Sequence, residues 1–404
     1  MRWLLALLIC APFSLALVVG SSAEIGSDPV LYGDLIAYER DGNVHVYDVA
    51  RKQDFDVGNG TNPSIFGFVV AFESNKTIWF ANVRDKSVVD TQSVGSEPYV
   101  FSDVIVFSTK ESDLGVDFSN DGDLDDWILR QYDIKSEELV NLKAVGSHPV
   151  FNQRAIVFLT DESAVSADLN LDGDKSDVIL RLLDRQSRQV ANLKVESTPA
   201  SLSRLGIAVF ESGGTIRVMD VKDQMVVDTK LKGQHPVLFD NVVVFERNGE
   251  LFGYSLEDDV FAKIQLSGSA PALFDDLLVV VSSEDDLGDL NGNGILGERV
   301  IRYAREEDAD GDDVSDFVDN CPALAGEQLD SDGDGVGDGC ANMAQNESLY
   351  VAPMSNVTSS VPGQDKIYSG VGWYWVLLLL IPFLPALWKF GRKYYRRRQK
   401  SFGF

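Results

Sequence analysis

The chain has 404 residues and is strongly acidic, with 63 Asp and Glu against 35 Lys and Arg and a formal net charge of −28 at pH 7. This charge disfavours nucleic acid and an anionic membrane surface as partners of the acidic part. It fits a soluble domain that carries cations. Acid-rich surfaces also occur in proteins from high-salt habitats, and composition alone does not separate the two.

Residues 1–23 have the pattern of a secretory signal peptide. Arg2 supplies a positive start, an apolar stretch follows, and Ser21 and Ala23 are small residues at the −3 and −1 positions of a cleavage site. A membrane anchor is the alternative, but polar sequence follows at once. We therefore expect export of a mature chain that begins at Glu24.

Residues 24–305 contain seven repeats, each opened by a G-x-x-P element that is once E-x-x-P. The repeat prolines are Pro29, Pro63, Pro98, Pro149, Pro199, Pro236 and Pro271. Short runs rich in Val, Ile, Phe and Tyr follow each proline between Gly, Asn and Asp turns, which predicts strands. Each unit is too small to bury a core alone, and the regular period favours a seven-bladed β-propeller over a sandwich.

The last repeat lacks a fourth strand before the acidic run at residue 306. The residues Glu24–Gly26 match the end of a unit, so we expect them to supply the outer strand of the last blade and to close the ring. The units follow the pattern P-x-L-x-x-x-V-V-F and then V-x-x-Y-D, which resembles the TolB-like propellers of prokaryotic surfaces and periplasms. The resemblance implies the fold and says little about function.

Three repeats carry an insertion between the same two predicted strands, so the insertions should lie on one face. They read "DFSNDGDLDD" (117–126), "DLNLDGDKSD" (168–177) and "DLNGNGILGE" (289–298). Each offers side-chain oxygens at positions 1, 3, 5 and 10 around a glycine at position 6, and calcium prefers such hard oxygen ligands. The predicted ligands are Asp117, Ser119, Asp121 and Asp126, then Asp168, Asn170, Asp172 and Asp177, then Asp289, Asn291, Asn293 and Glu298.

These insertions differ from an EF-hand because position 12, which needs an acid, is apolar in all three. Position 10 would take that role, and without flanking helices the loops are not expected to open as sensors do. The alternative is that Asp, Asn and Gly simply form turns here.

The segment 306–342 resembles a thrombospondin type 3 repeat. It contains D-x-D-G-D-x-V-x-D-x-x-D-N-C-P and then Q-x-D-x-D-G-D-G-V-G-D-x-C. The resemblance implies a segment organised by calcium, with the ligands Asp308, Asp310, Asp312, Asp316 and Asp319, then Asp330, Asp332, Asp334 and Asp338. Asp313 replaces a glycine of the motif and Ala341 replaces a final acid, so the second site should be weaker or borrow a ligand. The alternative is a disordered acidic linker.

The chain has three cysteines, and Cys10 lies in the predicted signal peptide. Cys321 and Cys340 remain as an even pair in an oxidising compartment, where a disulfide between them is expected.

The C-terminal part predicts a single membrane span. Residues 343–369 are polar and read as a flexible stalk, 370–390 are apolar with aromatic residues at both ends, and 391–404 form a basic tail. The positive-inside rule places this tail in the cytoplasm, which makes the chain a single-pass type I protein of the cell surface. A buried core helix is the alternative, and the dense basic stop argues against it.

The sequence contains no phosphate-binding loop and no zinc-protease or serine-hydrolase motif. His45 lies in a predicted strand, and His148 and His235 precede repeat prolines at equivalent blade junctions, so structural roles are favoured for His148 and His235. We favour a non-enzymatic, calcium-binding surface propeller that serves adhesion, envelope organisation or binding of a protein or glycan. The alternative is an extracellular hydrolase or lyase acting on polysaccharide, because abundant carboxylates leave a catalytic pair open. An enzyme should show converging acids and aromatic residues in the central channel, whereas a binding protein should show an exposed patch on one face.

Overall fold

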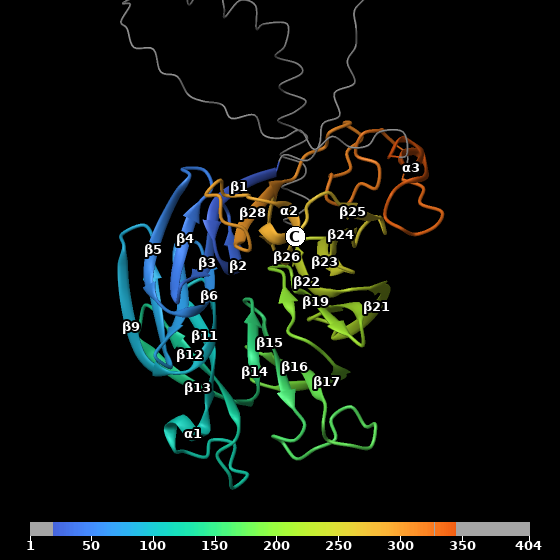
Figure 1. Cartoon of the computed structure of the whole chain (residues 1–404). Helices are drawn as coiled ribbons and strands as arrows, with labels where there is room; N and C mark the ends of the chain where they lie inside the picture. Colours follow the sequence, from blue (N-terminus) through green and yellow to red (C-terminus); the bar gives the residue numbers. More distant parts are fainter. Residues whose placement is uncertain (1–18, 327, 345–404) are drawn as a thin grey trace, which may run out of the picture. The chain divides into compact units, whose positions relative to one another are not determined.

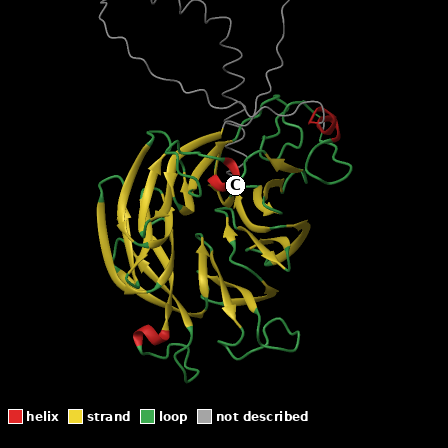
Figure 2. Ribbon diagram, in the orientation of Figure 1, coloured by secondary structure: helices red, strands yellow, loops and turns green. Residues whose placement is uncertain are grey.

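The computed structural model describes residues 19–326 and 328–344. Within these ranges, 28 strands form seven four-stranded antiparallel sheets arranged around a common centre (Figures 1 and 2). The predicted all-β, seven-bladed propeller is therefore confirmed.

Several predictions concern other parts of the chain. Residues 1–18 of the predicted signal lie outside the described residues, as do the span (370–390), the basic tail (391–404) and all of the stalk beyond residue 344. Within the described ranges, no helix has the length and apolar character that crossing a membrane requires.

The first four blades follow the chain in order. Blade one contains β2 (Ser27–Tyr32), β3 (Leu35–Arg40), β4 (Asn43–Asp48) and β5 (Gln53–Asn59). Blade two contains β6 (Thr61–Phe66), β7 (Val69–Ser74), β8 (Thr77–Asn82) and β9 (Ser87–Val94). Blade three contains β10 (Ser96–Phe101), β11 (Val104–Lys110), β12 (Trp127–Asp133) and β13 (Glu138–Val145). Blade four contains β14 (Ser147–Phe151), β15 (Ala155–Asp161), β16 (Val178–Asp184) and β17 (Val190–Glu196).

The remaining blades continue this order until the ring closes. Blade five contains β18 (Ser201–Leu202), β19 (Ile207–Ser212), β20 (Thr215–Asp220) and β21 (Met225–Lys232). Blade six contains β22 (Gln234–Phe239), β23 (Val242–Arg247), β24 (Glu250–Ser255) and β25 (Phe261–Ile264). Blade seven contains β26 (Ser269–Phe274), β27 (Leu277–Ser283), β28 (Arg299–Arg305) and β1 (Val19–Ile25). The short helices are α1 (Glu111–Leu114), α2 (Glu284–Leu287) and α3 (Asp338–Ala344).

The repeated G-x-x-P element starts the innermost strand of a blade, and its residue types follow from that place. A Cβ atom on Gly60 or Gly95 would collide with the ring of Phe72 or Phe107 on the next strand, so this position excludes larger residues. In every unit except that of blade five, the residue before the proline has positive φ, for example 53° at Asn62, and the strand register shifts there. The motif therefore encodes a bulge with a close aromatic contact.

Blade seven is closed by the N-terminal strand, as predicted. Strand β1 pairs with β28, with Ile25 opposite Val300. The strand starts at Val19, so the predicted boundary after residue 23 falls inside it. Glu24 also forms an ion pair with Arg40 of blade one, and the two blades share an apolar cluster that includes Ile36 and Val279. Main-chain pairing and packing therefore both join the ends of the ring.

The strand order places the insertions on one face. The insertions of blades three, four and seven each join the second strand to the third, and α1 and α2 begin two of them. We call this side the loop face; Figure 1 shows α1 at the lower edge of blade three. The opposite face carries the turn between the first and second strands of each blade. The ends of these first strands line a central cavity of about 130 Å³.

The segment after the ring packs on blade six. Phe317 is 1% exposed and belongs to an apolar cluster with Val244 and Leu251. Gly253 of β24 has no room for a Cβ atom, because the Phe317 carbonyl fills that space. The Lys263 N–H donates a hydrogen bond of 2.9 Å to the Gly335 carbonyl. Contacts with the propeller therefore help to position residues 306–342.

Candidate metal centres

Five acidic loops of the chain share one turn. In the first, the Asp117 carboxylate accepts hydrogen bonds from the N–H groups of Asn120 (2.5 Å) and Gly122 (3.1 Å), three and five residues later. The same two bonds recur at the loops that begin with Asp168, Asp289, Asp308 and Asp330. The first carboxylate of each loop therefore holds a tight turn, and the next acidic or amide side chains alternate along it.

In the C-terminal segment, this turn gathers the predicted ligands. Asp308, Asp310 and Asp312 each offer an oxygen, and these oxygens lie within 4.8 Å of one another. Asp330, Asp332 and Asp334 form a second group that meets the same limit. Both triplets predicted by the motif are thus brought together in the structure.

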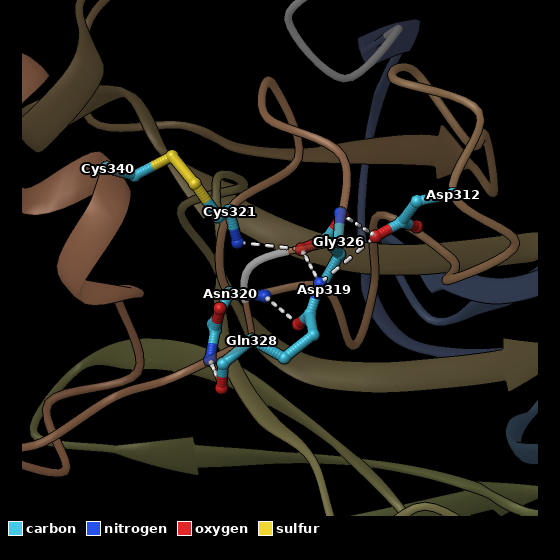
Figure 3. Close-up of a disulfide and its surroundings, with 7 residues drawn as sticks. All are labelled: Asp312, Asp319, Asn320, Cys321, Gly326, Gln328 and Cys340. Atoms are coloured by element: carbon cyan, nitrogen blue, oxygen red, sulfur yellow. Dashed lines mark hydrogen bonds between the residues drawn. A yellow bond between two sulfur atoms is a disulfide. The ribbon is translucent and has the colours of Figure 1, made fainter.

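Asp319 is 1% exposed, and Gln328 lies between it and Asp312 of the first triplet (Figure 3). The Oδ1 of Asp319 accepts hydrogen bonds from the Cys321 N–H (2.7 Å) and the Gln328 Nε2 (2.8 Å), whereas its Oδ2 has no hydrogen-bond partner. Burial raises the pKa of Asp319, and the nearby charges of Asp312 and Asp310 raise it further. A cation at this point would offset the unfavourable burial of the charge.

The remaining acids of the segment brace the loops. Asp316 accepts a hydrogen bond of 3.1 Å from the Ala309 N–H, and burial raises its pKa. Asp338 accepts hydrogen bonds from the side chain and N–H of Ser331, and these bonds lower its pKa. Cys321 and Cys340 form a disulfide with 19 residues of sequence separation, which ties both halves together.

In the insertions of the propeller, predicted positions 3, 5 and 10 converge. Asn170 donates from Nδ2 to the carboxylates of both Asp172 (3.1 Å) and Asp177 (2.7 Å). In blade seven, Asn291 and Asn293 both donate to the Oε2 of Glu298 at 2.7 Å. Rotating an amide would present its oxygen to the same point.

Blade three differs in detail. The Ser119 hydroxyl donates to the carboxylate of Asp117 at 3.1 Å, and Asp126 is 1% exposed with one unpartnered carboxylate oxygen. Burial raises the pKa of Asp126, and the nearby Asp121 and Glu111 charges act in the same direction, against a hydrogen bond from Ser119.

The structure also brings in acids that sequence reasoning missed. Glu111, Asp123 and Asp126 form one group with oxygens within 4.8 Å, and Glu162, Asp174 and Asp177 form another. The acids at position 1 of these loops are not members of either group. A glutamate five or six residues before the first aspartate of each insertion was the available signal.

The histidines occupy structural positions. His45 is buried and lies 2.9 Å from the Asp54 carboxylate, and Asp54 also accepts a hydrogen bond of 2.7 Å from the Tyr38 hydroxyl. His148 and His235 lie at the strand bulges with φ of 50° and 49°, where each faces a glutamate.

The central cavity has a different character. The Arg204 guanidinium lies 5.1 Å from the ring centres of Tyr32 and Phe274, and 5.5 Å from that of Phe66. Among the described residues that line this cavity, Asp240 is the one acid. Burial raises the pKa of Asp240, and the nearby charge of Asp275 raises it further, whereas Arg204 lowers it.

No family model matches the chain, and a search of curated proteins likewise gave no match. Among solved structures, oligogalacturonate lyase from Vibrio parahaemolyticus is 13% identical with a TM-score of 0.49, over 73% of this chain and 95% of that one. An oligogalacturonate lyase in complex with manganese is 12% identical with a TM-score of 0.45, over 67% and 85% of the two chains. The β-propeller domain of the Trilobed protease from Pyrococcus furiosus is 13% identical with a TM-score of 0.45, over 64% and 88%. These likenesses concern the propeller fold and leave the TolB-like and thrombospondin type 3 resemblances unconfirmed.

Proposed function

We propose that this chain is a calcium-organised propeller of the cell surface that binds a protein or glycan ligand through its loop face. The ring and the segment 306–342 form the ectodomain. The predicted stalk, span and basic tail attach it to the membrane as a type I protein. Binding rather than turnover is the proposed role.

The loop face carries this proposal. Three insertions with converging oxygens lie on it, and they expose apolar side chains that turns do not need. Leu171, Ile295 and Leu296 are 69%, 58% and 63% exposed. Apolar side chains exposed on a polar face are available for contact with a ligand.

The donor chemistry favours calcium over other metals. The four acidic groups consist of carboxylates alone, and neighbouring positions add hydroxyl and amide oxygens. Calcium takes six to eight such oxygens in flexible geometry, whereas magnesium demands a near-ideal octahedron and retains water. Bound calcium would hold the insertions, and with them the exposed leucines, in one conformation.

A glycan array probed with the purified full-length protein tests the proposal, read for both retention and cleavage, with calcium or with a chelator. We expect retention that calcium supports and the chelator abolishes. Retention that is equal in the chelator contradicts the calcium-dependent role. Cleaved glycan on the array would instead favour the hydrolase or lyase alternative.

Two variants make the test specific for the face. Leu171→Glu on the loop face should reduce retention at least tenfold, because it places a charge in the proposed contact. Leu205→Glu is the matched control, because Leu205 is 63% exposed but lies in the turn between β18 and β19, on the opposite face. Equal loss in both variants would contradict the assignment of the face.

A further inference from the structure

Each insertion of the propeller begins with a buried glutamate that directly follows the second strand of its blade. Glu111 and Glu162 are 0% exposed, and Glu284 is 1% exposed. Glutamate is rarely buried completely unless a partner compensates its charge. Each of these glutamates therefore needs a nearby partner that compensates its charge.

One oxygen of each glutamate has a defined task. The Oε1 of Glu111 accepts hydrogen bonds from the N–H groups of Phe118 (2.5 Å) and Ser119 (2.7 Å), at positions 2 and 3 of its loop. Glu162 and Glu284 accept the same pair of bonds from their own loops. The glutamate thus fixes the loop to the end of the strand and sets its own orientation.

The second oxygen is the informative one. The Oε2 of Glu111 and of Glu284 has no hydrogen-bond partner, and neither has the buried Oδ2 of Asp126. An unpartnered buried carboxylate oxygen is unfavourable, because the group loses its water and gains nothing in return. Two such oxygens in one insertion indicate a cation between them.

The geometry of blades three and four completes the argument. The oxygens of Glu111, Asp123 and Asp126 lie within 4.8 Å of one another, and Glu162 repeats the arrangement with Asp174 and Asp177. In blade four, the Asp177 N–H also donates to the Oε2 of Glu162 at 3.3 Å. Blade seven has Ile295 at the place of Asp123, so its site has one acid fewer.

We infer that Glu111 and Glu162 are metal ligands, each of which holds one divalent cation of the calcium class against the end of its blade. The outer ligands are Asp123 with Asp126, and Asp174 with Asp177. This inference rests on the proposed calcium binding and deepens it: the ion bridges the loop and the strand, so its binding positions the loop face. Blade seven would bind the same cation more weakly.

Terbium luminescence on the purified full-length protein tests blade three separately, since terbium takes calcium sites and is sensitised by a neighbouring tryptophan. Trp127 follows the ligand Asp126, whereas Val178 and Arg299 occupy the same place in blades four and seven. We expect terbium emission on tryptophan excitation, displaced by calcium and at least tenfold less by magnesium. Trp127→Phe should remove the larger part of this emission. Emission that is unchanged by this substitution overturns the assignment.

The key variant is Glu111→Gln. The amide oxygen still accepts the two loop hydrogen bonds, so a purely structural role would leave ion affinity unchanged, whereas a ligand role predicts at least a tenfold loss. Glu162→Gln should lower calcium stoichiometry by one ion without changing the Trp127 signal. Asp125→Asn removes a charge from the same loop outside the acidic group and is the matched control.

Asp123→Asn keeps the test decisive if Glu111→Gln does not fold, because Asp123 is exposed. This variant should lower the terbium and calcium affinity of the same site at least tenfold, with an unchanged circular dichroism spectrum. Unchanged terbium and calcium affinity in folded Glu111→Gln, or in Asp123→Asn, overturns the inference. Neither of these two outcomes would decide the proposed function, because the array measures calcium-dependent ligand retention independently.

Discussion

The insertions of the blades and the C-terminal segment use the same turn in different surroundings. An insertion is anchored at both ends by strands, and a buried glutamate ties it to its blade through backbone hydrogen bonds. The segment 306–342 has the start of α3, one disulfide, a small apolar contact with blade six and the hydrogen bond from the Lys263 N–H to the Gly335 carbonyl. A calcium loop that the rest of the fold holds weakly therefore depends more on its bound ion for its structure.

Electrostatics sharpens this difference. Burial raises the pKa of Asp310, Asp316 and Asp319, and each is raised further by neighbouring carboxylates of the same segment. Without a cation these charges oppose the compact form, and little other packing compensates them. In the blades, repulsion between carboxylates destabilises only one loop of a four-stranded sheet. The apolar clusters between the blades are not affected.

Removal of calcium should therefore have the largest effect, and it should destabilise the C-terminal segment much more than the blades. With a chelator, we expect backbone amides of 308–338 to lose protection in hydrogen exchange, while strands such as β15 and β27 stay protected. The reason is that the segment needs its ions to offset carboxylate repulsion. Equal loss of protection in the blades would contradict the comparison, and magnesium in place of calcium serves as the control.

Phe317 attaches the segment to the ring. Phe317→Ala should destabilise the segment by about 3 kcal/mol, as expected for truncating a fully buried aromatic side chain. Differential scanning calorimetry in calcium should show a lower transition for the segment and an unchanged one for the propeller. Leu324→Ala is the control, because Leu324 is 38% exposed in the same segment. A fall in the propeller transition would show that the two unfold together.

Much of this architecture could be predicted from the sequence. The G-x-x-P repeats predicted seven blades because the proline recurs in every unit. In five units the glycine is also required, since a Cβ atom there would collide with an aromatic ring on the next strand. The closing strand could be predicted because the last repeat lacked a partner. Oxygens at positions 3, 5 and 10 were also found, since alternation along a turn is a local property.

Other features depend on contacts that local patterns do not show. Glu111, Glu162 and Glu284 precede their loops and look like surface acids in the sequence, and only the end of a strand buries them. Phe317 lies in an acidic segment, and its partners on blade six are more than 50 residues away in the chain. The start of β1 at Val19 was hidden because the same residues fit a signal peptide.

The smallest expected effect tests the turn itself. Asp313 stands at position 6 of its loop with φ of 75°, where the second loop has Gly335 with φ of 88°. Asp313→Gly should stabilise the segment by up to about 1 kcal/mol, because glycine adopts this conformation without steric cost. The reverse change, Gly335→Asp, should destabilise by more, since its Cβ would lie 3.0 Å from the Lys263 nitrogen and 3.1 Å from the Phe252 ring. Calorimetry in saturating calcium measures the stability of the segment in both variants. A stabilising Gly335→Asp would show that the turn does not constrain either loop.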